Sequence, residues 1–447
     1  MQYKWLVGAL ALSSVVTAHS PFIVRRQEAP TNAADAAKVH GGPEKECKGQ
    51  GDSTLTKMKS QFPDNWKIAS IVDDDSEAKD LWKDIKKNVP KNVKVKPGQS
   101  DHMGIDQSYM QKYDKSDPDC WWSANGDNGC TKPKAKGIPD DLYKCPEPST
   151  WGLTFDDGPN CSHNEFYDYL QKNKLRATLF YIGSNVQNQP YYAQRAIADG
   201  HDVCVHTWSH HYMTTLEDEQ VFAELYYTGK IIKTVLGVTP RCWRPPFGDV
   251  DDRVRAIAAG LGLRTILWQE DTNDWKISDG KATKKQVEER YNNFINKAND
   301  ESPIVLTHEI SKDSMDVFMD MQPKVSKAYK NVVPLTACFN VTNPYPEDIT
   351  YPDFKAFTDG ELDPKGKPDI SKVKVDAKAK YSVVPLSKQT ESGTYMKPGK
   401  GEKKSSSKGG GGGSSSDDDG GSGGAASLKV SLTLFASTAV VAAIAFL

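Results

Sequence analysis

The sequence predicts an α/β fold, a parallel barrel or near-barrel of about seven strand–helix units, lying between about Cys145 and Cys338. The first observation is that short apolar segments typical of buried strands alternate there with amphipathic segments of helical period. The second is that this alternation repeats often enough to curve a parallel sheet into a barrel. In such barrels the functional groups lie at the carboxyl ends of the strands, so the residues that follow each strand are the first candidates for a site.

The expected elements are bounded by turn and capping signals. Residues 151–155 are apolar and end at Asp-Asp-Gly-Pro, which forces a turn after a strand. Pro190 begins and Gly200 ends one helix, and Gly237 ends a longer one. The remaining strands are expected at residues 177–182, 202–205, 241–243, 264–268 and 304–306, and the helices at 163–173, 190–199, 217–236, 252–259 and 284–297.

The chain outside this region divides by composition. Residues 1–18 contain Lys4, an apolar run and small residues at Val16 and Ala18, which is the pattern of a secretory signal peptide cleaved near Ala18. Three parts are predicted to follow: an N-terminal extension (19–134), a catalytic domain (135–345) and an extended C-terminal segment (346–402). The extension is expected to be partly disordered, with a loose stretch at residues 19–50 and a helix near residues 76–87.

The C-terminal end predicts a lipid anchor. Residues 403–426 are rich in Ser, Gly and Asp and form a disordered stalk, and residues 427–447 end in an apolar tail. Small residues, a polar spacer and a terminal apolar tail are the signal for a glycosylphosphatidylinositol (GPI) anchor, attached between Gly420 and Gly424. The alternative is a plain tail anchor, which a signal peptide disfavours. We expect a secreted protein, GPI-anchored to the plasma membrane or the cell wall.

Charge and composition exclude several classes of protein. The 57 Lys and Arg against 59 Asp and Glu leave a net charge of −2, without the basic excess of a nucleic-acid-binding protein. No central stretch approaches the roughly 20 apolar residues of a spanning helix. The 10 Trp, 18 Tyr and 14 Phe are too many for a disordered chain, although only 37% of residues are hydrophobic. A folded core joined to polar segments fits both numbers.

Ionisable side chains follow five of the predicted strands. Each such group buried without a partner is costly, so folding alone does not explain the set, although Asp-Asp-Gly-Pro by itself is ordinary turn chemistry. Two imidazoles and one carboxylate can bind a divalent cation and leave a position open for water, while a second carboxylate and a separate histidine can act as base and acid. This combination predicts hydrolysis of an acyl bond such as an amide. The residues are Asp156, Asp157, His206, His210, Arg244, Asp271 and His308.

These residues lie in five ordered motifs that resemble those of the polysaccharide deacetylases, carbohydrate esterase family four. With the predicted signal peptide and anchor, the fifth-strand motif makes the chain most similar to fungal chitin deacetylases of the mannoprotein type of basidiomycete yeasts. The resemblance covers about 200 of the 447 residues and implies a distorted (β/α) barrel. The motifs are Thr-Phe-Asp-Asp-Gly-Pro (154–159), His-Thr-Trp-Ser-His (206–210), Arg-Pro-Pro-Phe (244–247), Asp-Thr-Asn-Asp-Trp (271–275) and Leu-Thr-His (306–308).

The resemblance implies a role for each polar residue. One divalent metal ion, Zn²⁺ or Co²⁺, would be bound by Asp157, His206 and His210. Asp156 would be the general base, held by an ion pair with Arg244. His308 would be the general acid that protonates the departing amine, and Asp271 would tune the pKa of His308. The implied catalytic residues therefore include both His308 and Asp271.

Three further residues are implied to contact the substrate. The backbone N–H of Phe247 would bind the oxyanion, and Trp275 and Leu306 would form an apolar wall for the acetyl methyl group. The chain departs from the family pattern at Phe247, where Tyr is common, and at Glu309, where Asp is common.

The implied function is metal-dependent hydrolysis of the N-acetyl groups of N-acetylglucosamine units in chitin, giving chitosan and acetate for cell-wall modification. The expected partners are chitin or chito-oligosaccharides and, through the anchor, the membrane; no nucleic acid and no obligate protein partner are implied. The alternatives are a deacetylase of another acetylated polysaccharide and a non-catalytic glycan-binding mannoprotein. A glycosidase is disfavoured because its carboxylate pair needs no metal-binding histidines.

Modification sites complete the prediction. Eight cysteines in a secreted chain indicate disulfides, and Cys145 and Cys338 bracket the catalytic segment, so we expect these two to pair. Cys204 and Cys242 either pair or remain buried thiols. Asn160 and Asn340 begin N-glycosylation sequons, and a glycan on Asn160 would stand near the cleft.

Overall fold

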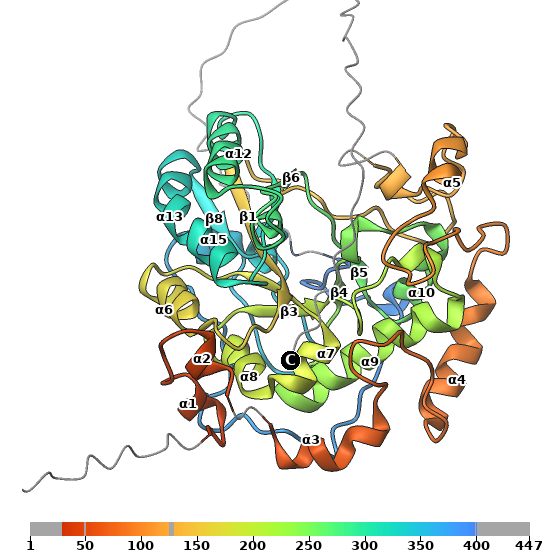
Figure 1. Cartoon of the computed structure of the whole chain (residues 1–447), viewed down its shortest axis with the longest axis horizontal. Coiled ribbons are helices and arrows are strands. Elements are labelled where there is room, and N and C mark those ends of the chain that lie inside the picture. The colour runs from red at the N-terminus through yellow and green to blue at the C-terminus, as the bar shows by residue number, and fades with distance from the viewer. Residues whose placement is uncertain (1–28, 49–50, 125–128, 398, 400–447) are drawn as a thin grey trace, which may run out of the picture. The chain divides into compact units, whose positions relative to one another are not determined.

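The computed structural model describes residues 29–48, 51–124, 129–397 and 399 (Figure 1). The predicted signal peptide, stalk and anchor signal lie outside these residues. None of the helices in the described part is long and apolar enough to cross a membrane.

The core of the protein is a parallel sheet with β1 (Thr150–Gly158) at its centre. The strand order is β5-β4-β3-β2-β1-β7-β6, and β8 also pairs with β1. Every residue of β1 is buried, because helices cover the sheet on its outer side (Figure 1). The other strands are β2 (Thr178–Tyr181), β3 (Asp202–Val205), β4 (Cys242–Trp243), β5 (Arg264–Thr265), β6 (Glu270–Asp271), β7 (Ile304–Leu306) and β8 (Asn331–Val333).

The two ends of this sheet are linked by one stretch of chain. Strand β5 pairs with β4, whereas β6, a few residues further along the same stretch, pairs with β7. The sheet is therefore curved into an incomplete, distorted barrel, as the sequence predicts. All its strand pairs are parallel, so their carboxyl ends meet on one side.

The helices between strands confirm the expected boundaries to within one or two residues. The longest, α9, begins at a capping box formed by Glu217 and Gln220 and ends at Gly237, whose φ is 80°. The helices that follow strands are α6 (Asn164–Lys172), α7 (Gly183–Asn188), α8 (Pro190–Ala198), α9 (Asp218–Leu236), α10 (Asp252–Gly260), α11 (Trp275–Ser278), α12 (Lys284–Asn296) and α13 (Lys312–Ala328).

The N-terminal segment wraps around one side and the base of the barrel in Figure 1. Helix α4 forms where a helix was expected, and its Trp82 belongs to the same hydrophobic core as the sheet. Our expectation that residues 29–48 are loose is wrong. These residues form the short helices α1 and α2, and Ala33 and Ala36 of α1 pack against Tyr192 of α8. The helices of this segment are α1 (Ala33–Ala36), α2 (Pro43–Glu46), α3 (Ser53–Met58), α4 (Ser76–Ile85) and α5 (Gln107–Lys112).

Disulfide bonds and the C-terminal segment fasten the barrel. Cys145 pairs with Cys338, as expected, and closes a long loop between the start of the barrel and α14 (Leu335–Cys338). Cys204 pairs with Cys242 and joins β3 to β4. The other two bonds are Cys47–Cys161 and Cys120–Cys130. Beyond α14 come α15 (Phe354–Thr358) and a segment whose Tyr381 and Tyr395 are buried on the core.

Candidate active site

Three potential metal ligands converge at the carboxyl ends of β1 and β3. The Asp157 Oδ1 atom lies 3.4 Å from His206 Nε2 and 3.1 Å from His210 Nε2. One ligand atom from each residue lies within 4.8 Å of the others, and the carboxylate and His206 are buried. The structure thus brings together the three residues that the sequence singles out as a ligand set.

The orientation of this trio suits a divalent cation. The Nδ1 atom of His206 lies 2.8 Å from the Arg244 carbonyl oxygen, which can only accept, so Nδ1 donates and Nε2 presents a lone pair to the trio. Asp157 Oδ1 is buried without a hydrogen-bond partner in the described part of the chain. Burial opposes its charge, but His210 and His206, when protonated and without a bound cation, hold the pKa of Asp157 well below its usual value. Two imidazoles and a carboxylate fit Zn²⁺ and similar ions.

The backbone around the trio is held in an unfavourable conformation. Asp157, Thr207, His210 and Phe247 have φ values of 70°, 65°, 57° and 58°, in the left-handed region that side chains other than glycine rarely adopt. Each such residue costs on the order of 1 kcal/mol or more, and such residues cluster at functional sites.

Asp156 and Arg244 form the expected ion pair beside the trio. Arg244 Nη1 donates to Asp156 Oδ1 over 2.7 Å and to the Thr154 hydroxyl over 2.9 Å. The guanidinium is fully buried against the Phe180 ring, at 4.1 Å from its centroid. Burial lowers the pKa of Arg244, and Asp156 opposes that shift. The second oxygen, Asp156 Oδ2, lies 3.7 Å from His206 Nε2 and therefore faces the trio.

His308 is paired with Asp274, three residues after the predicted partner Asp271. Its Nδ1 lies 2.6 Å from Asp274 Oδ1, and its backbone N–H donates to Asp274 Oδ2 over 2.8 Å. Burial opposes protonation, but Asp274, together with Asp157 and Asp156, raises the pKa of His308 to about 10. The Asp271 carboxylate instead accepts from the Asn273 N–H over 2.7 Å. The tuning role that the sequence analysis gave to Asp271 stays a prediction; β6 ends at Asp271, and the turn that follows places Asp274 next to His308.

The three expected substrate-contacting residues lie around this centre. Phe247 is 38% exposed, and its ring stacks on Tyr212 at 4.1 Å and meets the His210 ring edge-on at 4.7 Å. Leu306 is buried two residues before His308, and Trp275 begins α11 directly after Asp274. Leu306 and Trp275 therefore adjoin the His308–Asp274 pair in the chain, and Phe247 lies beside the trio.

A buried polar cluster behind the site accounts for the glutamate at position 309. Its carboxyl group lies 3.0 Å from His163 Nδ1 and 3.3 Å from the Tyr167 hydroxyl. Burial raises the pKa of Glu309 well above its usual value and lowers that of His163 well below it, so burial favours the neutral form of each group. A Cβ atom at Gly158 would meet Glu309 Oε1 at 1.6 Å, so this acid requires glycine in the Asp-Asp-Gly-Pro motif. The sequence carries no signal for this cluster, because none of the five motifs includes His163.

The two sequon asparagines remain predictions as glycosylation sites. Asn160 is partly exposed, and its Nδ2 donates to the Ile310 carbonyl over 2.9 Å. Asn340 is also partly exposed, and its Oδ1 accepts from the Phe354 N–H over 2.9 Å.

A trio of potential metal ligands with an ion-paired carboxylate and a carboxylate-paired histidine at the strand ends of a parallel barrel is the arrangement expected of a metal-dependent hydrolase. The chain belongs to the polysaccharide deacetylase family, whose sequence model matches residues 143–266. This family membership confirms the resemblance found in the motifs. Enzymes of this family use a divalent metal, and Asp157, His206 and His210 form a possible site for such an ion.

Similar proteins include several fungal enzymes. Chitin deacetylase 2 of Cryptococcus neoformans var. grubii is 46% identical over 351 residues, covering 76% of this chain and 74% of that protein. The chitin deacetylase of Amylomyces rouxii is 44% identical over 310 residues, covering 67% and 71%. The solved structure of the chitin deacetylase from Colletotrichum lindemuthianum is 26% identical with a TM-score of 0.43, covering 46% of this chain and 94% of that one.

Proposed function

We propose that the protein hydrolyses the N-acetyl groups of N-acetylglucosamine units in chitin, giving chitosan and acetate. The observation that carries this proposal is that the ligand trio, the Asp156–Arg244 pair and the His308–Asp274 pair all lie at the carboxyl ends of the barrel strands. Amide hydrolysis needs a base for water and an acid for the amine, and the site offers one candidate for each. The chitin deacetylases among the relatives support chitin as the substrate.

Asp157, His206 and His210 would hold one divalent ion, zinc or cobalt. When bound, such an ion polarises the amide carbonyl and lowers the pKa of a water molecule. Asp156 takes the proton of the attacking water, and Arg244 holds this carboxylate in place through its Nη1 contact of 2.7 Å.

The collapse of the tetrahedral intermediate requires a proton on the amide nitrogen. His308 donates it from Nε2, because its Nδ1 proton is held by Asp274. The developing oxyanion accepts a hydrogen bond from the Phe247 N–H, which is worth about 10²-fold or more in comparable sites. Trp275 and Leu306 enclose the acetyl methyl group and exclude water from it.

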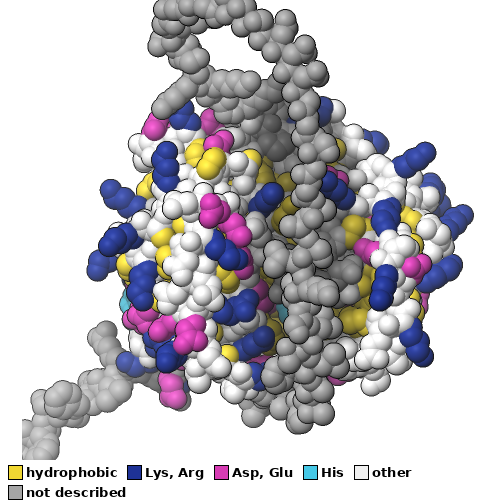
Figure 2. Space-filling view, turned by 90° about the horizontal axis from the view of Figure 1, so that it is seen from above, with side chains coloured by type: hydrophobic (Ala, Val, Ile, Leu, Met, Phe, Trp, Pro, Cys, Tyr) yellow, Lys and Arg dark blue, Asp and Glu magenta, His cyan; other side chains and the backbone are white. Residues whose placement is uncertain are grey.

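The site of action is the outer surface of a fungal cell. Four disulfides are typical of secreted proteins, and they support export through the predicted signal peptide. The GPI signal at residues 427–447 would tether the enzyme to the plasma membrane or the cell wall, close to chitin. Charges of both signs occur across the coloured surface of the face in Figure 2.

Acetate release from N-acetylglucosamine oligomers by the purified ectodomain tests the proposal. We expect release that stops when a chelator is added and returns with Zn²⁺ or Co²⁺. Release from acetylated xylan but not from chitin oligomers would assign another polysaccharide. Metal binding and oligomer binding without release would identify a non-catalytic glycan-binding protein.

A further inference from the structure

A buried carboxylate next to the Phe247 loop joins three distant parts of the chain. Asp249 is fully buried and accepts four hydrogen bonds. Its Oδ1 accepts from Trp121 Nε1 and the Ser123 hydroxyl, both at 2.9 Å. Its Oδ2 accepts from the N–H and the hydroxyl of Thr214, both at 2.8 Å. Residues 117–124, here called the Trp121 segment, are thereby tied to the loop after His210 and to the loop that carries Phe247.

Trp122, in the same segment, packs directly against the Phe247 loop. Its N–H donates to the Val250 carbonyl over 3.0 Å. A Cβ atom at Gly248, where φ is 67°, would meet Trp122 Cζ3 at 2.2 Å, so the ring lies flush against that backbone. The ring also contacts Trp268 at 4.9 Å, and the Trp268 ring lies 5.7 Å from the Arg244 guanidinium. The segment thus contacts the loop directly and lies behind the Asp156–Arg244 pair.

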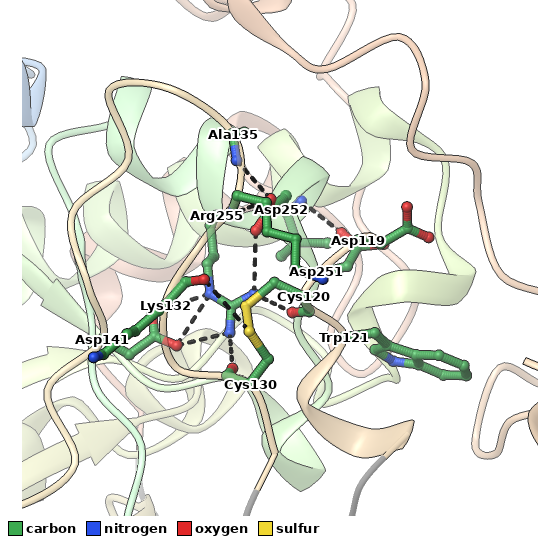
Figure 3. Close-up of polar contacts among 12 residues, drawn as sticks. Asp119, Cys120, Trp121, Cys130, Lys132, Ala135, Asp141, Asp251, Asp252 and Arg255 are labelled. Carbon is green, nitrogen blue, oxygen red and sulfur yellow. Dashed lines mark hydrogen bonds and ion pairs between the residues drawn. A yellow bond between two sulfur atoms is a disulfide. The ribbon is translucent and has the colours of Figure 1, made fainter. Parts of the chain in front are cut away.

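The Trp121 segment is itself firmly held (Figure 3). The buried Arg255 of α10 donates to the carbonyls of Cys120 and Cys130, at 2.6 and 2.8 Å. Its guanidinium also pairs with Asp141 at 2.7 Å, and Cys120 and Cys130 are joined by a disulfide. Because a buried ion pair and a disulfide fix the Trp121 segment, this segment can hold another loop in one position.

We propose that the Trp121 segment is a positioning element of the active site, which holds the Phe247 backbone in place through Asp249. This proposal rests on the proposed function, in which the Phe247 N–H stabilises the oxyanion. The left-handed φ of 58° at Phe247 is unfavourable for a bulky residue and persists only where the surroundings enforce it. Trp121 and Asp249 act as positioning residues, because the chemistry occurs at neither side chain.

The test compares two single hydrogen-bond deletions in the full ectodomain. Trp121→Phe removes one donor to Asp249 and keeps an aromatic ring. Tyr395→Phe is the matched control: it removes one donor, at 3.1 Å, to the buried Asp202, which begins β3 at the end remote from the site. We expect kcat of Trp121→Phe to fall about 10- to 100-fold, the effect of a small misplacement, with KM and metal content unchanged. Tyr395→Phe should leave kcat unchanged.

Hydrogen exchange provides a readout that does not depend on turnover. In Trp121→Phe we expect faster amide exchange at residues 244–250, and in Tyr395→Phe no change there. Faster exchange in Trp121→Phe alone supports the positioning role even if the wild-type protein releases no acetate from chitin oligomers. The absence of acetate release would overturn only the proposed function. Wild-type kcat and wild-type exchange in Trp121→Phe would overturn the inference, as would an equal loss of kcat in the control. Should Trp121→Phe fail to fold, Ser123→Ala removes the neighbouring donor from a partly exposed residue, with the same expected directions and the same refutation.

Discussion

Replacing Asp274 with asparagine should move the alkaline limit of activity to lower pH. The substitution removes one negative charge next to His308 and keeps an oxygen to accept from Nδ1, 2.6 Å away. Burial alone would lower the pKa of His308, and Asp274 is the largest of the contributions that raise it to about 10. An adjacent opposite charge typically shifts a pKa by about 1–3 units. Asp274→Asn should therefore lower the pKa of His308 by about that amount.

The sign of the effect follows from the role of the residue. The general acid must be protonated, so activity is present below the pKa of His308 and is lost as pH rises through it. In Asp274→Asn that loss should occur about 1–3 pH units lower than in the wild type. A bound metal ion also disfavours the imidazolium form of His308 in both proteins. It therefore lowers the alkaline limit of the wild type and of Asp274→Asn alike, and the limit of the variant remains the lower of the two.

The assay is kcat for acetate release measured from pH 5 to pH 11, with metal content determined for each protein. Asp271→Asn is the matched control, because it removes the same charge from the same motif without touching the hydrogen bond to His308. An alkaline limit unchanged in Asp274→Asn but lowered in Asp271→Asn would refute the tuning role of Asp274 and support the assignment of Asp271 made from the sequence.

Three further results are expected. Asp156→Asn should abolish acetate release with metal content unchanged, whereas His206→Ala should lose both, as measured by elemental analysis of purified variants; an active Asp156→Asn protein would remove the base assignment. Glu309→Gln should keep kcat within about threefold of the wild type, because a neutral carboxyl is replaced by a neutral amide; a large loss would mean that the carboxyl is charged. Trp82→Ala should lower the free energy of unfolding by about 3–5 kcal/mol in denaturant titrations, in one transition with the barrel, since Trp82 is part of its core; a separate transition would contradict this.

The parts of the fold that the sequence predicts are those encoded by neighbouring residues. Strand β1 and helix α9 each end at a local signal, Asp-Asp-Gly-Pro and Gly237, and both are where expected. Helix α13 was missed because Pro323 lies inside it, and proline normally indicates a helix end. The capping box at Ser311 was the signal that could have revealed it.

Within the site, too, features carried by sequence motifs could be predicted, whereas contacts set by the three-dimensional structure could not. The ligand trio was implied by the family motifs, and the parallel topology explains why its members meet, since the carboxyl ends of β1 and β3 lie on one side of the sheet. The choice between Asp271 and Asp274 could not be predicted, since both lie in one motif and only the conformation of the turn selects which reaches His308. The hydrogen bond between Trp121 and Asp249 spans 128 residues and has no local signature.

The pairing of charges explains how one barrel end tolerates so many buried ionisable groups. Arg244 neutralises Asp156 and His308 neutralises Asp274, each through a contact below 3 Å, which offsets much of the cost of burial. Asp157 is the carboxylate left over, and its partners are the two histidines that complete the trio. A cation at that position supplies the missing opposite charge. The fold therefore places the Asp157 carboxylate, which contacts two imidazoles, where a metal ion would compensate its charge, while Asp156 and His308 keep Arg244 and Asp274 as their own partners.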